Sequence, residues 1–137
     1  MRLLLLAILN KTSSGNIFGG AEKSIINLAN WLAQNTEHEV YLSSVEGKEK
    51  PYYIDDKVKY NGMEVNEKSK IAKHNRIRLN TVNEIRRVNP DIVISFWVQP
   101  LFYMVLSGIR LPFIYSERND PSLEYGFIAQ KMRDIVL

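Results

Sequence analysis

Short apolar runs alternate with amphipathic segments along this chain, and that alternation limits its fold more than any other feature. Short β-branched apolar runs are typical of buried strands, whereas apolar positions three and four residues apart are typical of helices. The expected strands are residues 2–9, 39–44, 58–60, 91–97 and 111–116, and the expected helices are 21–34, 69–88, 100–109 and 122–137. Helices that regularly separate strands predict an α/β fold with a doubly wound, mostly parallel sheet and helices on both faces.

The first apolar run, RLLLLAIL, admits two interpretations, a secretory signal peptide or a buried strand. It begins with one basic residue, Arg2, but no pattern of small residues for cleavage follows it. An amphipathic helix comes next, as a strand–helix unit requires. We therefore favour the strand, and no apolar stretch in the sequence has the length needed to cross a bilayer.

Composition excludes several classes of protein. The 137 residues are enough for one domain with its own core. The net charge of +3 is too small to predict a nucleic-acid-binding protein. There is no cysteine, which excludes disulfides and thiolate chemistry. The two histidines, His38 and His74, lack metal-ligand spacing, so we assign them no chemistry and expect neither a metal nor a cofactor.

The loops that follow the strands are the expected ligand-binding segments. In open parallel sheets, ligands bind beyond the carboxyl ends of the strands, where the winding of the chain reverses. Residues 10–20, 96–99 and 116–120 each follow a predicted strand. The sequence therefore predicts that these three segments lie close together.

A pair of glycines, Gly19 and Gly20, stands at the start of the first predicted helix. Glycine lets a ligand approach the backbone, and the free N–H groups of a helix start attract phosphate. We interpret the pair as a diphosphate-binding turn, with tight helix–strand packing as the alternative. Glu22 lies in the first turn, where a carboxylate suits the helix dipole as well as a ligand contact.

Other cleft candidates follow the later strands. Glu117, Arg118 and Asn119 come directly after the strand that ends at Ser116, and an arginine fork suits a phosphate or carboxylate. Turn chemistry around Pro121 is the alternative for Asn119. Further candidates to line the cleft are Trp97 and Gln99, although tryptophans at strand ends are often core or rim residues.

The predicted helix 69–88 carries a basic face. Lys73, Arg76 and Arg87 lie opposite the apolar positions Ile71, Leu79, Val82 and Ile85. A solvated helix face is the simpler interpretation, and docking on anionic lipid headgroups is the alternative. No aromatic residues interleave with these cations, which argues against a platform for single-stranded nucleic acid.

Three blocks in order carry a family resemblance: GGAEKSIINLANWLA with HEVYLSS, then RRVNPDIVISF, then PFIYSERNDP. Together they resemble the amino-terminal domain of family 4 glycosyltransferases, the retaining GT-B class, over nearly the whole chain. The resemblance implies a Rossmann-like domain that forms the amino-terminal half of a GT-B fold. It also implies that the Gly19–Gly20 turn closes on the diphosphate of a nucleotide-sugar donor.

The same resemblance implies what the rest of the enzyme would do. The whole enzyme would transfer a sugar from a UDP- or GDP-linked donor to a glycan or lipid-linked acceptor, in bacterial surface polysaccharide assembly. Family members carry a Glu-x7-Glu pair in a carboxyl-terminal nucleotide-sugar domain, and this sequence has no such pair. We therefore expect residues 1–137 to be an incomplete acceptor-side domain that is inactive alone, and we assign it no catalytic residue.

One further departure from the family pattern and two alternatives remain. Many family members have a histidine after the strand equivalent to PFIYS, where this chain has Glu117 and Arg118. A nicotinamide-binding domain is disfavoured because the GxGxxG fingerprint is missing. A stand-alone α/β binding or regulatory module without activity stays open. The expected location is the cytoplasm, with peripheral contact at the inner face of the membrane as an option.

Overall fold

The computed structural model describes residues 1–9, 19–117 and 127–136, and these form one α/β layer structure. In the described residues the strands are β1 (Arg2–Ile8), β2 (Glu39–Glu46), β3 (Val58–Gly62), β4 (Ile92–Ser95) and β5 (Phe113–Tyr115). The helices are α1 (Gly20–Asn35), α2 (Lys70–Val88), α3 (Val98–Leu106) and α4 (Phe127–Val136). Strands and helices alternate in the order that the sequence predicts.

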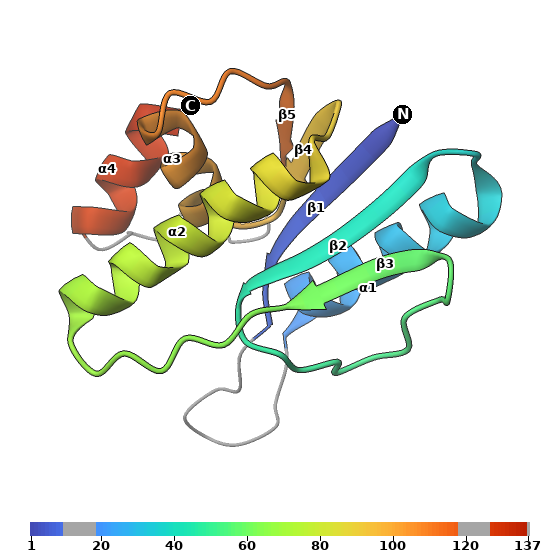
Figure 1. Ribbon diagram of the computed structural model, residues 1–137, viewed down its shortest axis with the longest axis horizontal. Helices are drawn as coiled ribbons and strands as arrows, with labels where there is room; N and C mark the ends of the chain where they lie inside the picture. The colour runs from blue at the N-terminus through green and yellow to red at the C-terminus, as the bar shows by residue number, and fades with distance from the viewer. Residues whose placement is uncertain (10–18, 118–126, 137) are drawn as a thin grey trace.

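All five strands run parallel, in the spatial order β3-β2-β1-β4-β5 (Figure 1). β1 is central, so that Leu5 pairs with Leu42 on one side and Ile94 on the other. From β1 the chain winds outward through β2 and β3, then returns across β1 to β4 and β5. The winding therefore reverses between β1 and β4, where an open sheet presents its ligand crevice.

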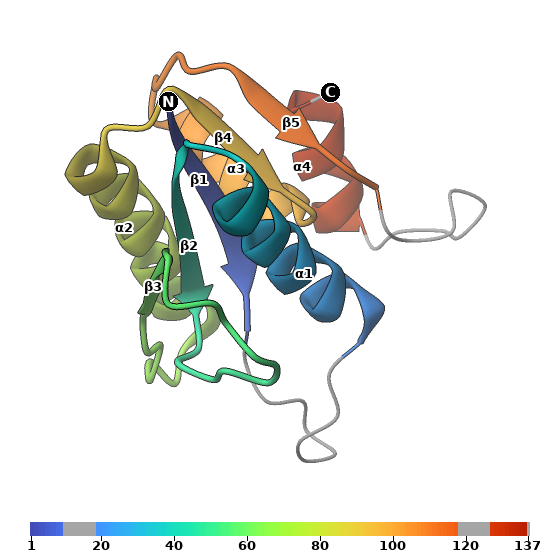
Figure 2. The same ribbon diagram turned by 90° about the vertical axis from the view of Figure 1, so that its right-hand side faces the viewer.

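The apolar run of β1 serves both faces of the sheet, because successive side chains of a strand point to opposite faces. Leu3 and Leu5 pack in a core cluster with Ile25 and Ala29 of α1. The alternate residues Leu4 and Leu6 pack in a second cluster with residues of α2 and α3. Figure 2 shows α1 and α2 on opposite sides of the sheet. Burial on both faces explains why β1 is apolar at every position from Leu3 to Ile8.

Local signals set the ends of α2. The Ser69 hydroxyl accepts a hydrogen bond from the N–H of Ala72, which caps the first turn. At the other end, Asn89 adopts φ 49°, in the left-handed region, and its N–H still donates to the carbonyl of Ile85. Asparagine tolerates this conformation, and Pro90 then prevents the helix from continuing.

Several sequence predictions about local structure are wrong. Ile71 was expected on the apolar side of α2 but is 84% exposed, because the first turns of this helix extend past the sheet. The third helix begins at Val98 rather than Pro100. The strand predicted at 91–97 ends at Ser95, since Phe96 and Trp97 already belong to the turn into α3. The part of the last helix predicted over 122–126 lies outside the described residues.

Candidate functional site

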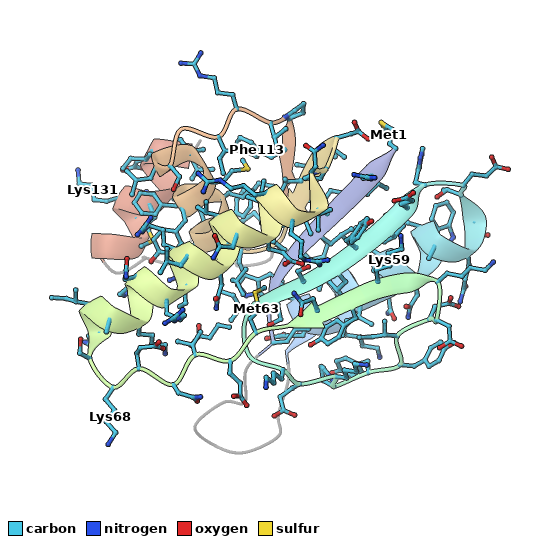
Figure 3. The ribbon with its side chains drawn as sticks, viewed as in Figure 1. Met1, Lys59, Met63, Lys68, Phe113 and Lys131 are labelled. Atoms are coloured by element: carbon cyan, nitrogen blue, oxygen red, sulfur yellow. The ribbon has the colours of Figure 1, made fainter. Side chains whose placement is uncertain are left out.

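The candidate site lies at the edge of the sheet where the strands end. We call this side the carboxyl edge, defined by the strand ends Ile8, Glu46, Gly62, Ser95 and Tyr115. Met1 marks the opposite, amino edge, and Met63, directly after β3, lies at the carboxyl edge (Figure 3). Both α1 and α3 begin at the carboxyl edge, on either side of the point where the winding reverses.

Two buried serines, Ser44 and Ser95, form hydrogen bonds to backbone groups at the carboxyl edge. The Ser95 hydroxyl lies 2.9 Å from the carbonyl oxygen of Leu6 and 3.0 Å from that of Trp97, and it accepts from the N–H of Trp97 at 3.1 Å. Ser44 accepts from the N–H of Leu9 at 3.0 Å. Because both hydroxyls are fully buried, these bonds satisfy backbone groups that water cannot reach. The starts of the ligand loops are thereby fixed.

The glycine pair occupies the start of α1, as the sequence predicts. Gly19 is the N-cap residue, with no side-chain cap, and Gly20 is the first helical residue. A Cβ on Gly20 would meet nothing within 4 Å, so the space beside it is open. An open backbone at a helix start is what the approach of a phosphate requires. Whether a diphosphate binds here stays a prediction.

Glu22 lies close to this helix start. A Cβ built on Gly19 would come within 3.1 Å of Oε2 of Glu22, so the carboxylate folds back over the first turn. A negative charge at this position stabilises the helix through its dipole. The same charge repels an incoming diphosphate. The geometry therefore fits the helix-stabilising interpretation of Glu22, and a ligand contact by this residue stays a prediction.

Trp97 and Gln99 flank the start of α3 but lie on different sides. Trp97 is the N-cap residue of α3 and packs, partly buried, against the core cluster on the α1 side. The Gln99 side chain lies within 3.3 Å of both His74 and Tyr103, on the α2 side. The structure therefore places both residues at the carboxyl edge, but their side chains contact different groups on opposite sides of the sheet.

The contacts of His74 were not predicted from the sequence. Its Nδ1 lies 2.8 Å from the hydroxyl of Tyr103, and Gln99 approaches both groups. These residues are separated by 25 and 29 positions in the sequence, so no local spacing brings them together. Only the packing of α2 on α3 does so, and no motif could have revealed it.

The Glu117–Asn119 segment is only partly described. Oε2 of Glu117, just after β5, lies 3.4 Å from Nε of Arg133 on α4. This ion pair gives Glu117 a structural role in joining the end of β5 to α4. Arg118 and Asn119 lie outside the described residues, so their proposed place in the cleft stays a prediction.

The three cations of the predicted lipid-facing surface each have a carboxylate neighbour. Lys73 lies 2.8 Å from Glu46, and Arg76 lies 2.8 Å from Glu67. Arg87 forms a two-point contact with Glu84, at 2.6 and 3.0 Å. The cations are exposed, as expected for a solvated face, and lipid docking stays a prediction.

A hollow of about 290 Å³ opens at the ends of β2 and β3. It is lined by Glu46, Glu49 and Glu64 together with Lys48 and three uncharged residues. Three carboxylates make this hollow unfavourable for a phosphate, although they can accept hydrogen bonds from sugar hydroxyls.

Metal-ligand clusters and membrane-spanning helices are both absent from the described residues. No group of three or more histidine, aspartate or glutamate residues in that part of the chain is arranged to hold a metal ion. Within the same residues, each helix is too short or too polar to cross a membrane.

Comparison with known proteins supports the fold. No family model matches the sequence, and no curated protein matches it either. Among solved structures, the chain is similar to a lipopolysaccharide outer core galactosyltransferase, WaaB, in its apo form, with 20% identity and a TM-score of 0.55. The alignment covers 84% of this chain and 32% of that one, so this chain spans about a third of its length.

This likeness confirms the predicted fold class, a Rossmann-like, doubly wound α/β domain like part of a GT-B glycosyltransferase. At 20% identity it shows the fold alone. The activity has to be argued from the residues at the carboxyl edge.

Proposed function

We propose that this chain is the amino-terminal, acceptor-side domain of a retaining, family 4 glycosyltransferase. The whole enzyme would transfer a sugar from a UDP- or GDP-linked donor to a glycan or lipid-linked acceptor, in the assembly of bacterial surface polysaccharide. The galactosyltransferase likeness and the three sequence blocks support this proposal. A carboxyl-terminal domain, outside residues 1–137, would hold most of the nucleotide sugar.

The observation that carries the proposal is the open start of α1 beside the reversal point. Gly19 and Gly20 are both exposed, and a Cβ on Gly20 would meet no atom of the described residues within 4 Å beyond its chain neighbours and the backbone of its own helix. A nucleotide diphosphate is a ligand that such a helix start can bind. In a two-domain enzyme, this turn would contact the donor from the acceptor side.

The proposed chemistry asks for positioning rather than a nucleophile in this domain. Retention can proceed when the leaving diphosphate assists attack from the same face of the sugar. The domain then contributes orientation of the acceptor and stabilisation of charge on the diphosphate. Gly19, Gly20 and Arg118 are the residues that we assign to this task, and none of them forms a covalent bond to the sugar.

The cytoplasmic face of the membrane is the location that fits a lipid-linked acceptor. The exposed cations Lys73, Arg76 and Arg87, together with the exposed Ile71, support peripheral contact with anionic headgroups.

The test is a transfer assay on the full-length gene product. UDP- and GDP-linked sugars, beginning with UDP-galactose, are incubated with lipid extracts as acceptors, and release of the nucleoside diphosphate is measured. Release that depends on the acceptor, with the anomeric configuration of the sugar retained, supports the proposal. Saturable binding of a glycolipid without turnover of any donor would support the alternative, a stand-alone binding module.

A further inference from the structure

His74 of α2 and two residues of α3 form a hydrogen-bonded cluster that the proposed function does not use. Nδ1 of His74 lies 2.8 Å from Oη of Tyr103 and 3.3 Å from Nε2 of Gln99. Nε2 of Gln99 also lies 3.3 Å from Oη of Tyr103. The cluster lies near the carboxyl edge, since Lys73, next to His74, contacts Glu46 at the end of β2.

The groups around Nδ1 of His74 favour one tautomer of the neutral ring. The Gln99 amide nitrogen carries only donor hydrogens, and it faces Nδ1. A hydrogen on Nδ1 would therefore point at another donor. The consistent arrangement has the Gln99 amide donating to the Tyr103 hydroxyl at 3.3 Å, and that hydroxyl donating at 2.8 Å to the lone pair of an unprotonated Nδ1. The neutral ring then carries its hydrogen on Nε2, which is a free donor at the exposed end of the side chain.

Tyr103 is suited to act as the fixed donor. Its side chain is only 5% exposed. Burial, and to a smaller extent the charge of Glu46, raises the pKa of the Tyr103 hydroxyl, although the hydrogen bond from Gln99 and the charge of Arg78 act against it. The hydroxyl therefore keeps its hydrogen at neutral pH and continues to donate to His74.

Cations outnumber carboxylates along the stretch of α2 beside the cluster. The stretch of α2 that contains His74 carries Lys70, Lys73, Arg76 and Arg78, and the carboxylates paired with these cations in the described residues are Glu46 and Glu67. An anion is therefore favoured over a neutral ligand. The hollow at the ends of β2 and β3 shares Glu46 with this surface, and its other two glutamates, Glu49 and Glu64, make the hollow the less favourable of the two for a phosphate.

We propose that His74, held by Tyr103 and Gln99, is the central donor of a phosphate-binding site on the α2–α3 side of the carboxyl edge. The ligand is a phosphate group, carried either by a soluble molecule or by a lipid headgroup. This site is separate from the glycine turn at the start of α1, and it requires no sugar transfer.

The test is nitrogen NMR of the histidine rings in the full-length gene product, at about pH 8, where free imidazole is neutral. The His74 signals are assigned with the His74→Gln variant. We expect Nδ1 to be unprotonated and Nε2 to carry the hydrogen. Added inorganic phosphate should shift Nε2 of His74 saturably, whereas sodium chloride at equal ionic strength should not. In a second titration, phosphatidylglycerol vesicles replace inorganic phosphate as the phosphate source.

Two variants sharpen the test. Tyr103→Phe removes one fixed donor, and we expect phosphate affinity to fall by roughly fivefold, as for the loss of one hydrogen bond. His38→Gln is the matched control, because His38 lies at the amino edge beside the terminal amine of Met1. Its phosphate binding should equal that of the wild type.

Each outcome decides the proposal. A response to phosphate ion supports it with a soluble ligand, and a response to vesicles alone supports it with a lipid headgroup. Hydrogen on Nδ1 instead of Nε2, or no shift with either phosphate source, overturns it. None of these readouts depends on turnover, so failure of the transfer assay would leave the result intact.

Discussion

The hydroxyl of Ser43, on β2, donates to a carboxylate oxygen of Glu84, on α2, across 2.7 Å, and both side chains are buried. Asn61 on β3 and Arg87 on α2 donate to the same carboxylate. Burial opposes the ionisation of Glu84, but these hydrogen bonds outweigh it and lower the pKa of the carboxyl group below 4.5. The network ties α2 to the edge of the sheet.

This relationship predicts a loss of stability in acid. Because the pKa of Glu84 is lower in the folded protein than in the unfolded chain, its stabilising effect is complete above about pH 4.5. It is lost as the pH falls through the folded value. The Glu84→Gln variant should unfold about 1–3 kcal/mol more easily at neutral pH, with a smaller difference from the wild type in acid. Urea denaturation at several pH values measures the free energy of unfolding of both proteins. A difference between wild type and Glu84→Gln that stays the same at every pH would contradict the prediction.

Gly20 gives a separate prediction, about ligand approach. Gly20→Ala should keep or slightly raise the melting temperature, because the site is open and Gly-to-Ala changes there gain about 0.4–1 kcal/mol. Gly20→Val should raise KM for the nucleotide sugar while the fold persists. Gly108→Ala is the control for a loss of stability without a change at the proposed donor site. Gly108 has a φ of 76°, so an alanine there is strained and should lower stability while KM stays unchanged. Unchanged KM in Gly20→Val would remove the turn from the site.

Glu22 gives a prediction in the opposite direction, a lower KM for the donor. Removing its charge in Glu22→Gln should cost about 0.3–1 kcal/mol of helix stability. It should also lower KM for the anionic donor, because the carboxylate lies over the helix start. Glu37→Gln, with the same change in charge beyond the end of α1, should leave KM unchanged. A KM that rises in Glu22→Gln would mean that this carboxylate contacts the ligand directly.

Ser95 tests whether the carboxyl edge depends on its buried hydroxyls. Ser95→Ala leaves the carbonyl of Leu6 and the N–H of Trp97 without this partner, and we expect a loss of about 1–3 kcal/mol. Ser107→Ala, at the other end of α3, should change stability by about 0.5 kcal/mol or less. The free energy of unfolding from urea titration distinguishes them, and equal values would show that the Ser95 bonds are dispensable.

The sequence predicted the order of the elements because the apolar runs of β1, β2 and β4 are buried and therefore strongly patterned. It failed where burial is decided by distant contacts. Ile71 looks like a core residue by spacing, but α2 extends past the sheet at that point, so Ile71 is 84% exposed. Spacing along a helix cannot indicate where its partner surface ends.

The candidate site could be predicted from the sequence only in part. The glycine turn follows directly from the rule that ligand loops come after parallel strands, and the structure places it at the reversal point. The contact of Gln99 with His74 was not predictable, because it depends on how α2 and α3 pack. The roles of Arg118 and Asn119 stay predictions.

The most direct test of the central claim is acceptor-dependent release of nucleoside diphosphate by the full-length gene product, compared with its Gly20→Val variant. We predict release from a UDP- or GDP-linked sugar by the wild type, and a clear reduction in the variant at an unchanged melting temperature. A wild-type protein that is folded but releases no nucleoside diphosphate from any donor, with any acceptor extract, would contradict the account.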